Sequence, residues 1–309
     1  MSMLAVAEGA ATIASIGECM VEFRQVDNGL FAIGFGGDTL NTAIYLARLG
    51  MNVDYITALG DDAHSKEMMT AWGREGVGTN HIVEVPGATP GLYVIQVDEK
   101  GERSFSYWRD HAPARKLFSL ASTEALSRHL SSYTLLYVSG ISMSLYGDEG
   151  RETLLQTLVD ARKAGARVAF DSNFRARGWP DRAQAEHWFA RIFGLADIIF
   201  ASTEDLQDIF GERFEARFRD AAPAAERVLK YPDLTVRVET GDQNESVVGE
   251  QAKRVVDTTA AGDSFAAAYL SARLTGASIR DAALAGHRLA SQVVGFPGAI
   301  IPQNAMGRV

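Results

Sequence analysis

Apolar residues along the chain alternate between short continuous runs and runs with helical spacing. Residues 12–17 (TIASIG) form a short run typical of a buried strand, and residues 39–50 then repeat apolar side chains every three or four positions, which favours a helix. We expect this helix to begin with Asp38 or Thr39 as its N-cap and to stop at Gly50.

The same alternation continues through most of the chain. Strands are expected at 53–60, 134–140, 167–173 and 196–202, and helices at 65–76 and 151–165. Strands separated by helices form βαβ units, which build a parallel sheet with helices on both faces. The predicted fold class is therefore α/β, with a mostly parallel central sheet. The polar region 215–233 contains prolines and shows no clear period, so it predicts no element.

Two segments interrupt this rhythm. Residues 19–37 have no helical period. Residues 91–110 are typical of a β-hairpin, because two runs rich in Val, Ile, Tyr, Phe and Trp surround the turn DEKGE at 98–102. We expect 19–37 and 89–110 to form a small inserted β-sheet, called the lid below. The α/β core would then comprise 1–18, 38–88 and 111–309.

Composition narrows the classes of protein. The chain has 309 residues, of which 47% are of hydrophobic type, enough for one large core. Its formal net charge of −9 argues against nucleic-acid partners, which need Lys and Arg to neutralise phosphates. Charges interrupt every apolar run before about 18 residues, so no membrane partner is expected. Cys19 is the only cysteine and the start of the chain does not resemble a signal peptide, which favours a cytoplasmic setting.

Candidate chemistry is concentrated in VVDTTAAGDSFAAAYL, residues 255–270, where a strand gives way to a helix. The first N–H groups of a helix lack partners and its dipole is positive there, so the small residues Ala260, Ala261 and Gly262 would let a phosphate approach. Asp263 would then accept a proton from an attacking hydroxyl, and the dipole would keep it ionised. An alternative is that this is an ordinary first-turn aspartate. The sequence contains no GxxxxGK[ST], which excludes a Walker-type P-loop, and the GxGxxG fingerprint is absent too.

Five segments, in this order, carry a resemblance to a known family. They are GFGGDTLNTAIYLARLG (34–50), PGLYVIQVDEKGERSFSYWRD (90–110), FDSNFRARGW (170–179), DTTAAGDSFAAAYL (257–270) and GAIIP (298–302). Together they resemble the ribokinase-like (PfkB) family of sugar kinases, most closely its 2-keto-3-deoxygluconate kinases. The resemblance implies a Rossmann-like core with a β lid, a homodimer through that lid, ATP and Mg2+ as cofactors, and phosphorylation of a small sugar acid on its 6-hydroxyl.

The resemblance also assigns roles to individual residues. It places the catalytic base at Asp263 and the anion hole at Ala260, Ala261 and Gly262. It assigns sugar contacts to six residues of the glycine-rich turn and the lid: Gly37, Asp38, Asn41, Tyr93, Tyr107 and Arg109. Arg109 matters most for substrate identity, because a guanidinium can bind a carboxylate with two hydrogen bonds. The alternatives are that Asp38 only caps its helix and that Arg109 is a solvated hairpin end.

Two further sites follow from the resemblance. Asn173 and Arg175 end a strand at the edge where open α/β sheets bind ligands; Asn173 is assigned to the nucleotide and Arg175 to substrate or phosphate. The alternative is a strand-end turn, with Arg175 and Arg177 both solvated. The family's metal motif, Asn-x-x-Glu, corresponds to Ser202 and Asp205, so Asp205 is the Mg2+ candidate. It could equally be a first-turn residue after an N-cap at Ser202 or Thr203. The six histidines show no zinc-ligand spacing.

The match weakens before the DTTAAGDS motif. Relatives carry a Lys-x-Gly segment there, and the corresponding run, 236–257, keeps Gly241 as a nucleotide-site candidate but has Glu239 in place of a basic residue. A carboxylate would repel ATP phosphates, so either Glu239 points away, or nucleotide affinity is altered, or the segment is rebuilt. Two other functions stay open: a kinase of ribose, fructose or a nucleoside, and a sugar-binding protein of the same fold with weak catalysis.

Overall fold

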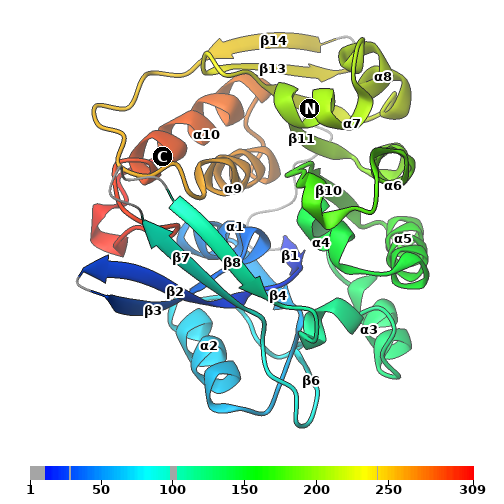
Figure 1. Ribbon diagram of the computed structural model, residues 1–309. Coiled ribbons are helices and arrows are strands. Elements are labelled where there is room, and N and C mark those ends of the chain that lie inside the picture. Colours follow the sequence, from blue (N-terminus) through cyan, green and yellow to red (C-terminus); the bar gives the residue numbers. More distant parts are fainter. Residues whose placement is uncertain (1–10, 28, 98–102, 242) are drawn as a thin grey trace.

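A computed structural model describes residues 11–27, 29–97, 103–241 and 243–309. Its centre is an eight-stranded sheet with the strand order β14-β13-β12-β11-β10-β9-β1-β4 (Figure 1). The parallel strands are β1 (Thr12–Ile16), β4 (Asn52–Ile56), β9 (Leu135–Ser139), β10 (Arg167–Asp171), β11 (Ile198–Ser202) and β12 (Glu226–Lys230). An antiparallel hairpin of β13 (Thr235–Thr240) and β14 (Gln243–Val248) extends the sheet beyond β12.

Helices cover both faces of this sheet. One face carries α1 (Asp38–Arg48), α2 (Ala63–Arg74), α9 (Ala261–Leu274) and α10 (Ile279–Val293), which share one hydrophobic cluster with the sheet. The other face carries α3 (Thr123–Leu130), α4 (Gly140–Leu145), α5 (Asp148–Lys163), α6 (Arg182–Leu195), α7 (Thr203–Phe210) and α8 (Phe214–Ala221), around a second cluster. Every residue of β9 is buried, as expected for a strand covered on two sides. The α/β prediction is confirmed.

A separate four-stranded sheet lies across one side of the core (Figure 1). Its strands are β3 (Leu30–Gly36), β2 (Met20–Asp27), β7 (Leu92–Val97) and β8 (Arg103–Trp108), in that order across the sheet. All four fall within the two segments expected to form the lid. The predicted turn at 98–102 lies outside the described residues, as do residues 1–10 of the predicted core.

Smaller elements complete the fold. They are the strand pair β5 (Ala58–Leu59) and β6 (Val83–Glu84), and the short 3-10 helices η1 (Pro113–Lys116), η2 (Ala176–Gly178) and η3 (Gln303–Ala305). The strand expected at 53–60 is divided into β4 and β5. The region 215–233 contains most of α8 followed by β12; α8 shows no clear period because it buries only Phe218. In the part of the chain that the structure describes, no helix is both long and apolar enough to span a membrane.

Candidate active site

A cavity of about 910 Å³ lies between the core and the lid. Its floor includes the last residues of three neighbouring parallel strands, Asp171 of β10, Ser202 of β11 and Lys230 of β12. Tyr93 and Tyr107 line it from the lid. The carboxyl ends of parallel strands are the usual binding edge of an open α/β sheet, so the cavity is where the fold places a ligand site.

The start of α9 forms one wall of this cavity. Ala260 precedes the helix with φ +61°, a left-handed conformation that favours glycine and stores about 1–3 kcal/mol of strain in other residues. Residues 260–263 all line the cavity, and the amide of Ala261 donates to the carbonyl of Thr258 at 3.2 Å. Because first-turn N–H groups have no partner within their own helix, residues 260–262 can serve as a cradle for an anion.

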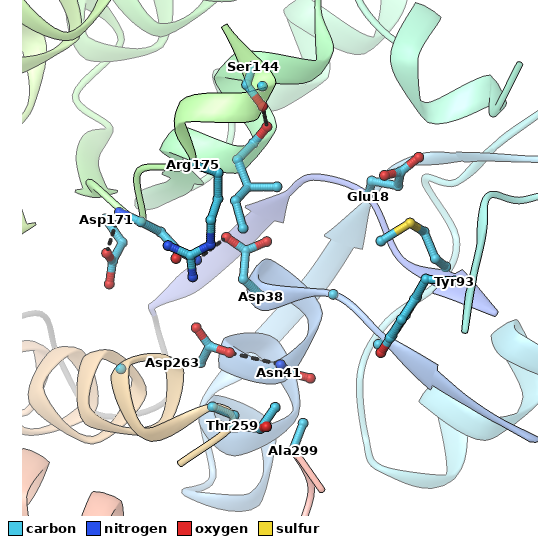
Figure 2. A pocket seen from close by; sticks show the side chains of 18 of the residues that line it. Glu18, Asp38, Asn41, Tyr93, Ser144, Asp171, Arg175, Thr259, Asp263 and Ala299 are labelled. Carbon is cyan, nitrogen blue, oxygen red and sulfur yellow. Dashed lines mark hydrogen bonds between the residues drawn. The ribbon is translucent and has the colours of Figure 1, made fainter. Parts of the chain in front are cut away.

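Asp263 lies in the first turn of α9, as predicted, and is only 9% exposed. Its Oδ2 accepts a hydrogen bond of 2.8 Å from Nδ2 of Asn41 on α1, and Figure 2 shows the two side chains pointing toward each other. Burial raises the pKa of Asp263 well above its usual range; the Asp38 charge raises it further, and the Asn41 hydrogen bond opposes both. Burial therefore acts against the effect expected of the helix dipole, which favours the ionised carboxylate. A higher pKa makes the ionised form a stronger base.

Asp38 does not cap α1. Gly37 occupies the N-cap position without a side-chain bond, and the Asp38 carboxylate lines the cavity. Its Oδ2 accepts a 2.8 Å hydrogen bond from Nδ2 of Asn173, which follows β10. A Cβ at Gly37 would overlap the carbonyl oxygen of Glu18. Glycine there lets the start of α1 pack against the connection between β1 and β2.

Arg109 is not a solvated hairpin end. Its guanidinium pairs with Glu18, whose side chain is 1% exposed, and both residues line the cavity. Burial raises the pKa of Glu18, while the Arg109 charge acts in the opposite direction. The rings of Tyr93 and Tyr107 stack at a centroid distance of 5.8 Å, and the Tyr93 hydroxyl donates to Glu22. The lid thus presents an anchored cation and two aromatic rings to the cavity.

Arg175 and Arg177 both line the cavity from the segment that follows β10. The Arg175 Nη1 donates to its neighbour's carbonyl, Phe174 O, at 2.7 Å, and Figure 2 shows the Arg175 side chain on the wall of the cavity. The Arg177 guanidinium lies 4.1 Å from the ring centroid of Tyr107 in the lid. These exposed cations therefore lie against the cavity and not in an isolated turn.

Asp205 follows an N-cap at Ser202, whose Oγ accepts from the Asp205 amide at 3.0 Å. Its carboxylate nevertheless lines the cavity, where Oδ2 accepts from Ser172 Oγ at 2.6 Å. Asp171 adds a second carboxylate nearby. Oxygen donors of this kind fit Mg2+, which keeps several waters and binds one or two carboxylates together with phosphates. Across the described ranges no group of three His, Cys, Asp or Glu side chains forms a ready-made metal cage.

Glu239 points away from the cavity, which is the first of the three explanations given above. Its carboxylate pairs with Arg227 at 3.1 Å and Arg237 at 3.0 Å, beside α8. Gly241 lies in the turn between β13 and β14, with φ +53°, and is not among the residues that line the cavity. The basic charge at this wall comes from Lys230 of β12, whose Nζ lies 3.4 Å from Asp171 Oδ2.

The structure thus brings together every predicted site residue except Gly241. It also adds lining residues that the sequence analysis did not propose as site residues: Glu18, Arg115, Ser144, Asp171, Arg177 and Lys230. One of these carried a readable signal. Asp171 is a charged residue at the end of the mainly apolar strand RVAFD, and in a parallel sheet such positions meet at the binding edge.

Comparisons with known proteins agree with this geometry. The profile of the pfkB family carbohydrate kinases matches residues 10–306. The chain is 40% identical to a 2-dehydro-3-deoxygluconokinase of Dickeya dadantii, covering 95% of this chain and 98% of that protein. It is 38% identical to a protein of the same name from Escherichia coli K12, with the same coverage.

Solved structures share the fold. A fructokinase with bound ATP from Xylella fastidiosa superposes with a TM-score of 0.83 at 24% identity, covering 96% of this chain and 94% of that one. A 2-dehydro-3-deoxygluconokinase from Thermotoga maritima superposes with a TM-score of 0.78 at 21% identity, covering 94% of this chain and 96% of that one. At these identities the two structures bear on the fold only. The family match over nearly the whole chain, with relatives at 38–40% identity, is decisive: the chain belongs to the pfkB family of carbohydrate kinases.

Proposed function

We propose that the protein transfers the γ-phosphoryl group of ATP to the 6-hydroxyl of 2-keto-3-deoxygluconate, also called 2-dehydro-3-deoxygluconate. The names of the relatives at 38–40% identity support this substrate. The observation that carries the chemistry is the buried Asp263 carboxylate in the first turn of α9, next to the cradle of residues 260–262. A base beside an anion cradle is the arrangement that phosphoryl transfer to an alcohol requires.

In the proposed step, Asp263 accepts the proton of the 6-hydroxyl as its oxygen bonds to the γ-phosphorus. The bond from the γ-phosphorus to the bridging oxygen breaks, and ADP leaves with that electron pair. The amides at the start of α9 and the Arg175 guanidinium stabilise the charge on the transferred group. The raised pKa of Asp263 suits a group that must take up a proton.

Sugar binding is proposed for the opposite part of the cavity. Gly37, Asp38 and Asn41 face the hydroxyls, and Arg109 binds the carboxylate beside Tyr93 and Tyr107. This arrangement is supported by the position of these side chains on the cavity wall. The Glu18 pair holds the Arg109 guanidinium in place, and an anchored guanidinium loses less entropy when it binds a carboxylate.

Nucleotide and metal binding are proposed for the α9 side. Asn173, Arg175 and the cradle would contact the phosphates, while the position of Gly241 outside the cavity lining gives it no support as a contact. Asp205, with Asp171 nearby, would hold Mg2+ mainly through its waters. When bound, the ion would neutralise phosphate charge.

We also propose that 19–37 and 89–110 act as a lid that excludes water, since an open site would hydrolyse ATP. Two copies would associate through the outer face of the lid. A cytoplasmic setting belongs to the same proposal, because ATP is the donor and the single cysteine, Cys19, can form no internal disulfide.

A coupled assay of ADP release, with ATP, magnesium and a sugar panel, tests the function. We expect ADP release with 2-keto-3-deoxygluconate and much less with ribose, fructose or a nucleoside. Asp263→Asn is expected to lower turnover at least about 100-fold while sugar binding is kept. Asp160→Asn, an exposed change on α5, serves as the control.

Each other outcome has a defined meaning. Near-normal turnover in Asp263→Asn would remove the base from its role. ADP release with a neutral sugar alone would contradict the acid substrate. Tight binding of the acid sugar without any turnover would show a binding protein of the same fold.

A further inference from the structure

The Glu18 carboxylate is buried where the core meets the lid, and its charge is only partly compensated. Its Oε2 pairs with Nη2 of Arg109, and its side chain is 1% exposed. Its Oε1 is buried and has no hydrogen-bond partner in the part of the chain that the structure describes. Burial raises the pKa of Glu18, and the charge of Asp38 raises it further. A buried carboxylate in this state gains from a second cation.

Arg115 is the cation placed to provide that compensation. It lies in η1, where Pro113 and Ala114 are buried and fix the segment. Its own side chain is half-buried and lines the cavity. Across the described ranges, its guanidinium makes no hydrogen bond and no ion pair. Burial has the largest effect on the pKa of Glu18, and the charges of Arg109 and Arg115 both act against it.

Without Arg115, the charges at this end of the cavity do not balance for an acid sugar. Arg109 and Glu18 cancel, and Asp38 adds a further negative charge. A sugar carboxylate at Arg109 would share one guanidinium with Glu18, and like charges disfavour each other's ionised forms. The two cations that follow β10 also line the cavity, but they are exposed, so water and salt screen their charges. The half-buried guanidinium of Arg115 restores the balance.

We propose that Arg115 determines the preference for an acid sugar, because it compensates the buried Glu18 charge when a sugar carboxylate binds Arg109. This inference rests on the proposed function for the class of substrate and deepens it. Glu18 already cancels the charge of Arg109, so the second guanidinium leaves one positive charge for the ligand. A neutral sugar gains nothing from that charge, and Arg115 therefore discriminates between the two classes of sugar.

Sugar binding without ATP tests the proposal. Calorimetry would compare 2-keto-3-deoxygluconate with its 1-amide, a neutral analogue that keeps every hydroxyl, on the wild type, Arg115→Met and Arg115→Lys. We expect Arg115→Met to weaken binding of the acid about 10- to 100-fold and of the amide less than about 2-fold. Arg115→Lys should recover most of the loss. The matched control is Lys116→Met, which removes an exposed cation of η1 that is not among the residues lining the cavity.

A second substitution separates a charge effect from a structural one. Glu18→Gln removes the buried negative charge, so Arg109 alone should then serve the sugar carboxylate. In the Arg115→Met background, Glu18→Gln is expected to restore binding of the acid to within about 5-fold of the wild type. A loss caused by distortion of η1 would not be restored in this way, so failure of the rescue would overturn the proposal.

Labelling of the unmodified protein with a dicarbonyl reagent that modifies arginine avoids any dependence on variant folding. The modification rate of Arg115, followed by peptide mass spectrometry, should fall with the acid and stay near its ligand-free value with the amide. Equal weakening of acid and amide in Arg115→Met, unchanged binding of the acid, or equal protection by both ligands would each overturn the proposal and leave the kinase function standing. A wild type that binds the amide as tightly as the acid would overturn the acid substrate, and this inference with it.

Discussion

At the scale of single residues, the site places the Asp263 carboxylate where burial disfavours its ionised form. Asp263 is buried beside the negative Asp38, and both effects raise its pKa. The hydrogen bond from Asn41 lowers the pKa of Asp263, but by less than burial raises it. A carboxylate whose ionised form is poorly stabilised by the protein takes up a proton readily, which is the property that the proposed role as a base requires. Stability and activity should therefore change in opposite directions when it is neutralised.

We expect Asp263→Asn to stabilise the ligand-free protein at neutral pH. The folded pKa of Asp263 lies above the unfolded value of about 4, so wild-type stability falls as pH rises from about 4 through the folded pKa. Asparagine does not ionise and can still accept the Asn41 hydrogen bond. The melting temperature of the variant should exceed that of the wild type by about 1–3 °C near pH 7.5, and the difference should vanish toward pH 4.

Thermal unfolding by fluorescence between pH 4 and 8 measures this difference. Asp160→Asn is exposed and should show no gain that grows with pH. A difference in melting temperature that is constant across the pH range, or that has the opposite sign, would show that burial does not raise the pKa of Asp263.

At the scale of elements, β8 of the lid is fixed over the cavity at two points. Arg109, just beyond the strand, pairs with the buried Glu18, and Tyr107 lies beneath the Arg177 guanidinium of the core. The first contact is largely buried, whereas Arg177 is exposed. The contact between Arg177 and Tyr107 is therefore the one that opens with less disruption, and it should position Tyr107 for the sugar.

A double-mutant cycle tests this contact through calorimetric sugar binding without ATP. Arg177→Gln alone is expected to weaken binding about 2- to 5-fold, with a coupling to Tyr107→Leu of about 0.5–1 kcal/mol. Tyr107→Phe keeps the ring and should keep the coupling. If Arg177 instead binds the sugar carboxylate directly, Arg177→Gln would weaken sugar binding equally with Tyr107 and with Leu at position 107. The coupling would then be zero, which would contradict the prediction.

The sequence predicted the helices and strands better than it predicted the side-chain contacts between them. Continuous apolar strands and periodic helices predicted the parallel sheet, and the aromatic hairpin predicted part of the lid. Glu239 and Lys230 could not be resolved in the same way, because the face on which each projects depends on where β12 and β13 begin and how they pair. A shift of one residue reverses that face. The burial that raises the Asp263 pKa is likewise a property of the packed chain.

At the scale of the whole molecule, the lid has an outer face that the described chain does not cover. Phe31 and Ile33 of β3 and Trp108 of β8 are 41%, 57% and 61% exposed. The strand register places them on the face opposite Tyr93 and Tyr107. Large exposed apolar side chains on a small sheet with two open edges are typical of a protein–protein interface.

We expect two copies to associate through this face, and the association to support catalysis by holding each lid over its own cavity. Light scattering after size exclusion should give twice the chain mass for the wild type. Ile33→Glu with Trp108→Glu should give the single-chain mass, because two charges would be buried unpaired in the interface. Val248→Glu, on the exposed edge strand β14, is the matched control and should remain dimeric. If that control dissociates while the lid variant does not, the interface is the edge of the large sheet. The lid would then have to close without a partner.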